Sequence, residues 1–355
     1  YVPTIANGNL SGTCPVALKT VEDEAIRDLI AKQKAAGLHV ITDGEFRRSY
    51  WHLDYMWGLG GIERRTSRTG YLFHDEETTA DTAVVTGKVS GENHPFVEHF
   101  KFVKALEEDG QVARQTVPAP AQTYAEVILD RCDGQVESLR SVYADDEALI
   151  EDIAAAYRTV IADLYAAGCR SVQFDDCTWG IYCDGDFVAK TGMKPVDIQK
   201  VSELGVRLNN LAIEGKPEDL VITTHVCRGN YHSTYAFEGG YDPVAPYLFA
   251  DENVDAFYLE FDTPRAGTFE PLKYVAEGKK VVLGLVTSKQ PGLEDEDLLI
   301  SRINEAAKYV PLENLYLSPQ CGFASCECGN KLTEDEQWAK VALVRRVAER
   351  VWGEA

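Results

Sequence analysis

A histidine and a cysteine stand two positions apart in His225-Val-Cys227, at the end of an apolar run that begins at Leu220. Side chains repeat every second residue in an extended chain, so both would project on the same side of a β-strand. Imidazole and thiolate are borderline-soft donors that suit zinc better than magnesium or calcium, which prefer oxygen. The spacing predicts two ligands of one zinc ion, although His225 taken alone could equally be a buried core histidine.

Other polar residues follow further apolar runs of the chain. They are Asp43, Glu45, Asp175, Asp176, Glu260, Asp262 and Cys321. If the runs are parallel strands of one barrel, these residues converge on the face where barrel enzymes build their active sites. Glu260 and Cys321 would then complete a four-ligand site with the His-x-Cys pair, whereas Cys321 read by itself could be a buried thiol.

This donor set favours thiol chemistry. A free thiol has a pKa of about 8.5 and is mostly protonated at neutral pH, and binding to zinc deprotonates it. Two thiolate ligands also lower the Lewis acidity that a hydrolytic zinc site needs to activate water. The residues therefore predict an enzyme that transfers an alkyl group, most simply methyl, to a thiol.

The elements that would position these residues form repeated βα units. Short β-branched or apolar runs alternate with segments of helical period, which predicts an α/β (β/α)8 TIM barrel. The expected strands are 39–43, 114–118, 171–175, 220–225, 256–260, 280–284 and 315–318. An eighth strand is needed for closure, and it either precedes Tyr1 or escapes recognition.

Helices are expected at 21–36, 147–167, 195–213, 301–309 and 334–352, where apolar residues recur at spacings of three and four. Residues 64–98 break this rhythm with alternating Thr and Val, which predicts a β-hairpin inserted after the second strand. We interpret residues 1–355 as a single TIM-barrel catalytic domain. No apolar run is long enough to span a bilayer.

The net charge and the cysteine content limit the partners and the cellular location that we expect for this protein. The chain has 57 acidic and 35 basic residues and a formal net charge of -22, which disfavours nucleic acid and anionic membrane as partners. Nine cysteines and no visible export signal favour thiols or metal thiolates in a cytoplasmic protein. Cysteines that lack a ligand-type partner at metal spacing are interpreted as small buried side chains: Cys14, Cys132, Cys169, Cys177 and Cys183. The pair Cys326 and Cys328 is interpreted as loop thiols.

Five motifs, in one order, resemble the cobalamin-independent methionine synthase family, specifically its short single-barrel members that correspond to the C-terminal catalytic domain. They are Ile41-Thr-Asp-Gly-Glu-Phe-Arg-Arg-Ser-Tyr-Trp51, Val172-Gln-Phe-Asp-Asp176, His225-Val-Cys-Arg-Gly-Asn230, Tyr258-Leu-Glu-Phe-Asp262 and Leu317-Ser-Pro-Gln-Cys-Gly-Phe-Ala-Ser325. The resemblance implies zinc bound by His225, Cys227, Glu260 and Cys321. It also implies that homocysteine is the methyl acceptor and methionine the product.

The resemblance assigns the homocysteine ammonium to Glu45 and Asp175, and two carboxylates suit a cation. The Gly-Ser-Phe element that contacts homocysteine in relatives is not visible here. Where the long enzyme carries a catalytic histidine, this chain reads Gly284-Leu-Val-Thr-Ser-Lys289. Lys289 could supply the proton or bind the methyl donor, or it could be a solvated loop residue.

The methyl donor is left open: a methylfolate, a methylcorrinoid protein or another small methyl compound. One alternative function is zinc-dependent alkyl transfer to a different small thiol, of the epoxide:coenzyme M transferase type. Its sulfonate would want cations where Glu45 and Asp175 offer anions. A second alternative is a non-catalytic zinc-binding or thiol-binding protein.

Overall fold

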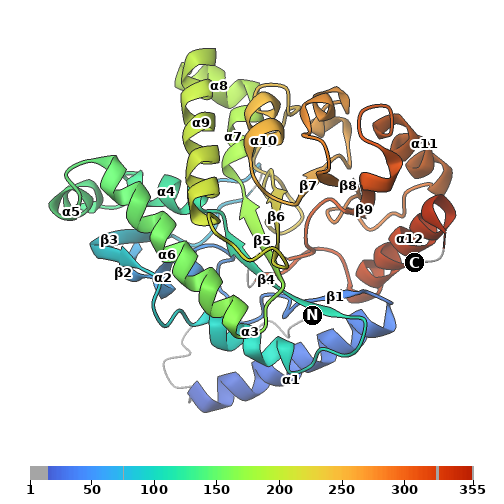
Figure 1. Ribbon diagram of the computed structural model, residues 1–355, viewed down its shortest axis with the longest axis horizontal. Coiled ribbons are helices and arrows are strands. Elements are labelled where there is room, and N and C mark those ends of the chain that lie inside the picture. Colours follow the sequence, from blue (N-terminus) through green and yellow to red (C-terminus); the bar gives the residue numbers. More distant parts are fainter. Residues whose placement is uncertain (1–14, 75, 325–327, 354–355) are drawn as a thin grey trace.

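The computed structural model describes residues 15–74, 76–324 and 328–353. Seven parallel strands form one sheet in the order β1-β4-β5-β6-β7-β8-β9 (Figure 1). Their bounds are β1 Val40–Ile41, β4 Val112–Pro118, β5 Ser171–Asp176, β6 Val221–Val226, β7 Ala256–Glu260, β8 Lys280–Val286 and β9 Leu315–Pro319. All seven strands expected from the sequence are present, which confirms a TIM-barrel-like α/β fold.

The barrel is partial in the described ranges. β1 and β9 are the two edges of the sheet, and these ranges contain no eighth parallel strand. The first and last described helices meet beside the sheet: Lys32 on α1 (Pro15–Ala35) donates to Glu334 on α12 (Glu334–Trp352) at 2.7 Å. This partly exposed ion pair links the two ends of the described chain.

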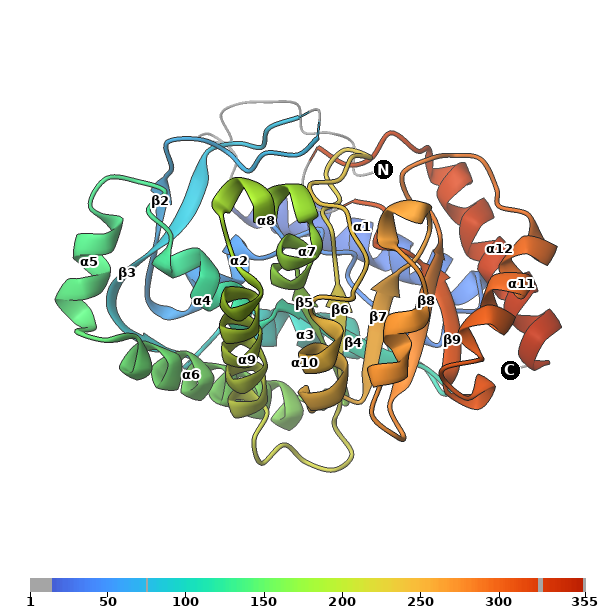
Figure 2. The same cartoon turned by 90° about the horizontal axis from the view of Figure 1, so that it is seen from above.

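The remaining helices cover the sheet and its hairpin, as seen from above in Figure 2. They are α2 Leu53–Gly58, α3 Phe96–Lys104, α4 Pro120–Ile128, α5 Gln135–Val142, α6 Asp146–Ala166, α7 Thr178–Cys183, α8 Gly185–Thr191, α9 Pro195–Ala212, α10 Ala245–Asp251 and α11 Glu296–Ala306, with short 3-10 turns at Pro264–Ala266, Glu270–Tyr274 and Leu312–Asn314. The five helices expected from the sequence are α1, α6, α9, α11 and α12. Within the described ranges, no helix is both long enough and apolar enough to cross a bilayer.

Local sequence signals set several helix starts. Asp145 accepts a hydrogen bond from the amide of Ala148 at the start of α6, and Asp295 does the same for α11. At α12, Thr333 and Glu336 form a reciprocal capping box. These caps satisfy amides that would otherwise lack partners at the helix ends.

The expected insertion is the antiparallel hairpin of β2 (Gly60–Thr66) and β3 (Asp81–Ser90). It begins and ends somewhat earlier than the predicted 64–98, and among the described residues it follows β1, the first strand. β3 packs against α5 and α6, so the two strands lie beside the barrel (Figures 1 and 2). The segment that joins them reaches the loop after β6, where the amide of His74 donates to the carbonyl of Tyr235 at 2.8 Å and Phe73 stacks on Tyr231.

The core lies between the sheet and its helices. Strands β6 and β8 are buried on both faces along most of their length, as expected of parallel strands covered on both sides. Gly284, in the middle of β8, has no room for a side chain, because a Cβ there would stand 2.7 Å from Cα of Gln320. This close approach brings the end of β9, and the cysteine after it, toward the neighbouring strands.

Candidate metal centre

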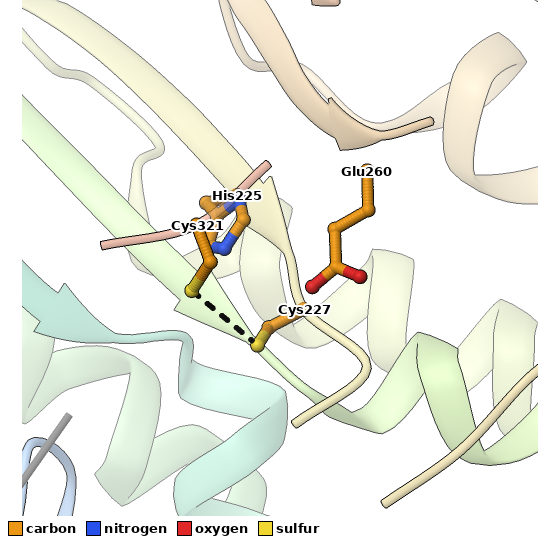
Figure 3. A group of neighbouring side chains, drawn as sticks. All are labelled: His225, Cys227, Glu260 and Cys321. Atoms are coloured by element: carbon orange, nitrogen blue, oxygen red, sulfur yellow. Dashed lines mark hydrogen bonds between the residues drawn. The ribbon is translucent and has the colours of Figure 1, made fainter. Parts of the chain in front are cut away.

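Four residues from three strand ends converge at the carboxyl-terminal end of the sheet. One donor atom from each of His225, Cys227, Glu260 and Cys321 lies within 4.8 Å of the other three. Figure 3 shows the two cysteines facing each other, with the histidine and the glutamate turned toward the same space. The two sulfurs are 3.8 Å apart. The convergence inferred from the strand ends is therefore present in the fold.

The sheet explains why these residues meet. β6 carries His225 and ends at Val226, so Cys227 is the first residue beyond it, and Glu260 is the last residue of β7. Cys321 lies two residues after the end of β9. Parallel strands place their carboxyl ends at one edge, so residues distant in sequence become neighbours.

The donor set fits a tetrahedral zinc ion. Two sulfurs bound to zinc at about 2.3 Å stand about 3.8 Å apart in a tetrahedron, which matches the spacing of the Cys227 and Cys321 sulfurs. Nδ1 of His225 lies 3.2 Å from the carbonyl oxygen of Tyr258, a contact that directs Nε2 into the site. That Nε2 is buried and has no hydrogen-bond partner of acceptable geometry among the described residues.

The charges of the cluster also favour a cation. Burial opposes the charged form of His225, yet Cys227, Asp175 and Glu260 together raise its pKa to about 9. Hydrogen bonds from Cys177 and Cys321, with His225 nearby, hold the pKa of Cys227 well below its usual range. Burial raises the pKa of Glu260, and the hydrogen bond to Cys227 raises that of Cys321; a divalent metal would favour the charged form of both donors.

Two arginines fix the glutamate of the cluster, and neither was predicted as a site residue. The backbone amide of Arg228 donates to Glu260 Oε1 at 3.0 Å, and the guanidinium of Arg265 donates to Oε2 at 3.1 Å. Glu260 is fully buried and the side chain of Arg265 is 8% exposed. The carboxylate is therefore held in one orientation. An arginine next to Cys227 could have been noted in the motif, but Arg265 is remote from it.

Glu45 and Asp175, the expected ammonium-binding pair, lie at the same end of the sheet. Glu45 Oε1 accepts hydrogen bonds from Arg48 at 2.9 Å and from Thr116 at 2.6 Å. Burial raises the pKa of Asp175 to about 7, with the charge of Glu45 adding to the effect and that of His225 opposing it. The two carboxyls therefore act on each other and, through Asp175, on the histidine of the cluster.

Glu45 occupies a strained backbone position. Its φ is +61°, a left-handed conformation that costs a non-glycine residue about 1–2 kcal/mol. The amide of Glu45 donates to the side chain of Asp43 at 2.8 Å and stabilises the turn. Backbone strain of this kind concentrates at functional sites, where the fold holds a side chain in a required direction.

Lys289 is buried, which excludes the solvated-loop interpretation. Lys289 is only 8% exposed, and its Nζ donates a hydrogen bond to Asn230 Oδ1 at 3.1 Å. Its positive charge acts on both Glu260 and Cys321. Lys289 thus faces the cluster from the loop that follows β8.

One expectation about the other cysteines is wrong. Cys177 was interpreted as an isolated buried thiol, but its side chain is hydrogen-bonded to that of Cys227. Cys132, Cys169 and Cys183 are buried as expected, and Cys328 is an exposed thiol. Cys14 and Cys326 lie outside the described residues.

The chain matches the family model described as the catalytic domain of cobalamin-independent synthase over residues 16–350. The chain belongs to the cobalamin-independent methionine synthase family. It is 40% identical over 342 residues to the uncharacterized protein YxjG of Bacillus subtilis, covering 94% of this chain and 86% of that protein. It is 24% identical over 311 residues to a methionine synthase of Saccharolobus solfataricus, covering 86% of this chain and 78% of that enzyme.

Solved structures of this family have the same fold. A Listeria monocytogenes protein, provisionally assigned as a vitamin-B12-independent methionine synthase, superposes with a TM-score of 0.73 at 37% identity, covering 97% of this chain and 91% of that one. A B12-independent methionine synthase from Shewanella, solved with selenomethionine, shares the fold at 22% identity with a TM-score of 0.72, covering 95% of this chain and 89% of that one.

Proposed function

We propose that this protein is a zinc-dependent methyltransferase that moves a methyl group to the thiol of homocysteine and so forms methionine. The observation that carries the proposal is the convergence of His225, Cys227, Glu260 and Cys321 within 4.8 Å. Membership of the cobalamin-independent methionine synthase family supports the same reaction class.

In this scheme His225, Cys227, Glu260 and Cys321 hold the metal. When bound, zinc supplies a Lewis acid that lets a substrate thiol exist as the more nucleophilic thiolate at neutral pH. Arg265 keeps Glu260 oriented, since it donates to that carboxylate at 3.1 Å. The burial of the donors excludes most water and strengthens the electrostatic interactions among them.

The substrate-binding roles fall to Glu45 and Asp175. A homocysteine ammonium between two carboxyls would relieve the repulsion that helps to raise the pKa of Asp175 to about 7. The amino acid would then be fixed with its thiol toward the metal donors, because Asp175 is paired with His225 in the sheet. Positioning of this kind contributes much of the rate of a two-substrate transfer.

Lys289 is proposed to act on the methyl-donor side. It is buried, carries a hydrogen bond to Asn230 and lies close enough to Cys321 and Glu260 to influence both. A lysine here can give a proton to the leaving group or bind an anionic part of the donor. The donor is a methylfolate, a methylcorrinoid protein or another small methyl compound.

Alkyl transfer to another small thiol is the second candidate, and the site argues against a sulfonate-bearing thiol. Arg48 is a cation beside Glu45, and its Nη1 already donates to that carboxylate at 2.9 Å. The pair Glu45 and Asp175 thus presents acidic groups where a sulfonate needs cations. A protein that only binds zinc or thiols would lack turnover with every methyl donor.

The test combines metal content with turnover. We expect one zinc per chain in the wild type and methionine formation from homocysteine with one of the three donor classes, measured by metal analysis and mass spectrometry. Cys321→Ser should lose or weaken zinc binding and lose activity. The exposed Cys328→Ser is the matched control and should behave as wild type. Wild-type zinc content and rate in Cys321→Ser would overturn the proposal.

A further inference from the structure

The strand register brings a third cysteine to the metal centre. β5 and β6 are parallel neighbours in which Asp175 pairs with His225 and Asp176 with Val226. The amide of Cys227 donates to the carbonyl of Asp176 at 3.4 Å, so the pairing continues to the strand ends. Cys177 comes directly after Asp176, and Cys227 comes directly after Val226. The two cysteines therefore occupy equivalent positions at the ends of neighbouring strands, which lie about 4.8 Å apart.

The two thiols lie beside each other. Cys177 and Cys227 share a side-chain hydrogen bond, and the charge of Cys321 also acts on Cys177. The Cys227 and Cys321 sulfurs are 3.8 Å apart, and Cys177 borders the four-donor group through Cys227 without being one of its four members. This arrangement has more donors than a four-coordinate zinc ion can hold, because His225 and Glu260 face the same space.

Cys177 is also placed to move. Its neighbours Asp176 and Thr178 are buried, and the amide and hydroxyl of Thr178 donate to Asp176 Oδ1, which fixes the backbone on that side. Cys177 itself is only partly buried. Rotation about a single side-chain bond would change where its sulfur points while the strand end stays in place.

We propose that Cys177 is a third sulfur donor of this centre, which binds the metal when no substrate is present and yields its place to the substrate thiol. The proposal rests on the proposed function, since it requires zinc at this site. In the exchange, the bond between metal and Cys177 sulfur breaks and a bond to the substrate sulfur forms. The proton of the substrate thiol passes to Cys177, so no oxidant or reductant is needed.

The exchange would serve two purposes. A catalytic zinc site keeps a position that its substrate can take, and a protein thiol there protects the metal between turnovers. Cys177 follows Asp175, the residue proposed to hold the substrate ammonium, by two positions. The substrate sulfur would thus arrive beside Cys227, where the thiol of Cys177 lies.

Zinc K-edge X-ray absorption tests the proposal, because it counts sulfur neighbours without requiring turnover. We expect three sulfurs per zinc in the wild type and two in Cys177→Ser. Adding homocysteine should leave the wild-type count unchanged and raise that of Cys177→Ser by one. Cys169→Ser is the matched control: this cysteine lies just before β5 at its opposite end, where its thiol contacts the carbonyl of Ser171, and its count should equal wild type.

A second measurement keeps the test decisive if Cys177→Ser fails to fold. Alkylation of Cys177 in the wild-type zinc protein, followed by mass spectrometry, should be slow, and either chelation or homocysteine should accelerate it. Two sulfurs per zinc in the resting wild type, with Cys177 equally reactive before and after homocysteine, would overturn this inference alone. Absence of zinc from the purified wild type would overturn the proposed function as well.

Discussion

Asp175 on β5 stands opposite His225 on β6 in the parallel ladder of the sheet. One strand thus presents the carboxyl proposed to bind the substrate ammonium, and its neighbour presents the first metal donor. The distance between these two functions is set by backbone hydrogen bonds and not by a loop. The same rigid pair of strands would therefore position both the amino group and the sulfur of the substrate. A transfer between two bound substrates requires such fixed geometry.

Asp175→Asn should weaken homocysteine binding and leave zinc in place. A hydrogen bond to a charged group contributes about 1.5–3 kcal/mol, so we expect KM for homocysteine to rise roughly ten- to hundredfold. Steady-state kinetics and metal analysis on the same preparation measure both effects. Asp186→Asn, on an exposed carboxylate of α8, serves as control. An unchanged KM would remove Asp175 from the substrate site.

Lys289→Met should lower kcat while zinc content and homocysteine binding persist. Loss of a positioned proton donor typically costs on the order of a hundredfold or more. Single-turnover kinetics with each donor class separate the chemical step from donor binding. Lys331→Met, which removes an exposed lysine paired with Glu76, is the control. If Lys289→Met instead lost zinc, the lysine would serve to neutralise the donor cluster.

Arg265→Gln should loosen the glutamate ligand and weaken the metal site. Residues that orient a metal ligand typically contribute ten- to hundredfold in metal affinity, so zinc competition with a chelator should show a decrease of about that size. Arg265→Lys, which can keep one hydrogen bond to Glu260, should lose less. Equal affinity in all three proteins would mean that the amide of Arg228 suffices to orient Glu260.

His94→Gln should reduce the loss of stability in acid. Burial lowers the pKa of His94 to about 4, and its ring is neutral because Nδ1 accepts from the amide of Phe96 while Nε2 contacts the carbonyl of Tyr55. The folded-state pKa lies below the unfolded value of about 6.5, so protonation favours the unfolded chain.

The contribution of His94 is therefore complete above pH 6.5 and is lost as pH falls toward 4, a difference on the order of 3 kcal/mol. Urea unfolding at several pH values measures it. The free energy of unfolding of the wild type should fall more steeply between pH 6.5 and 4 than that of His94→Gln. Parallel curves for the two proteins would show that the histidine is already exposed or charged.

The sequence predicted the strands well because each is a short apolar run that ends in a polar residue. The four metal-donor positions followed from that pattern together with the rule that parallel strand ends converge. His225 and Cys227 could be paired from spacing alone, whereas Glu260 and Cys321 required the fold. The eighth strand and the bounds of the hairpin could not be predicted as well. An alternating pattern of apolar and polar residues identifies a strand, but it does not show where strand pairing begins or ends.

Two features of the site depend on tertiary contacts. Arg265 reaches Glu260 from a short turn after β7, and no local pattern marks it. Cys177 was set aside because it has no partner within a few residues. Aligning the expected ends of 171–175 and 220–225 would have paired Asp175 with His225, and hence Cys177 with Cys227. The missing information was the register between strands and not the identity of any residue.

All four metal donors come from the second half of the chain, from β6, β7 and the segment after β9. A bound ion would act as a cross-link between His225 and Cys321, restricting the unfolded chain much as a disulfide between distant residues does. The hairpin and α1 to α5 lie outside that closed loop. Loss of metal should accordingly increase amide hydrogen exchange first around β6 to β9. Without the ion, the carboxyl-terminal half of the domain would open more readily than the amino-terminal half.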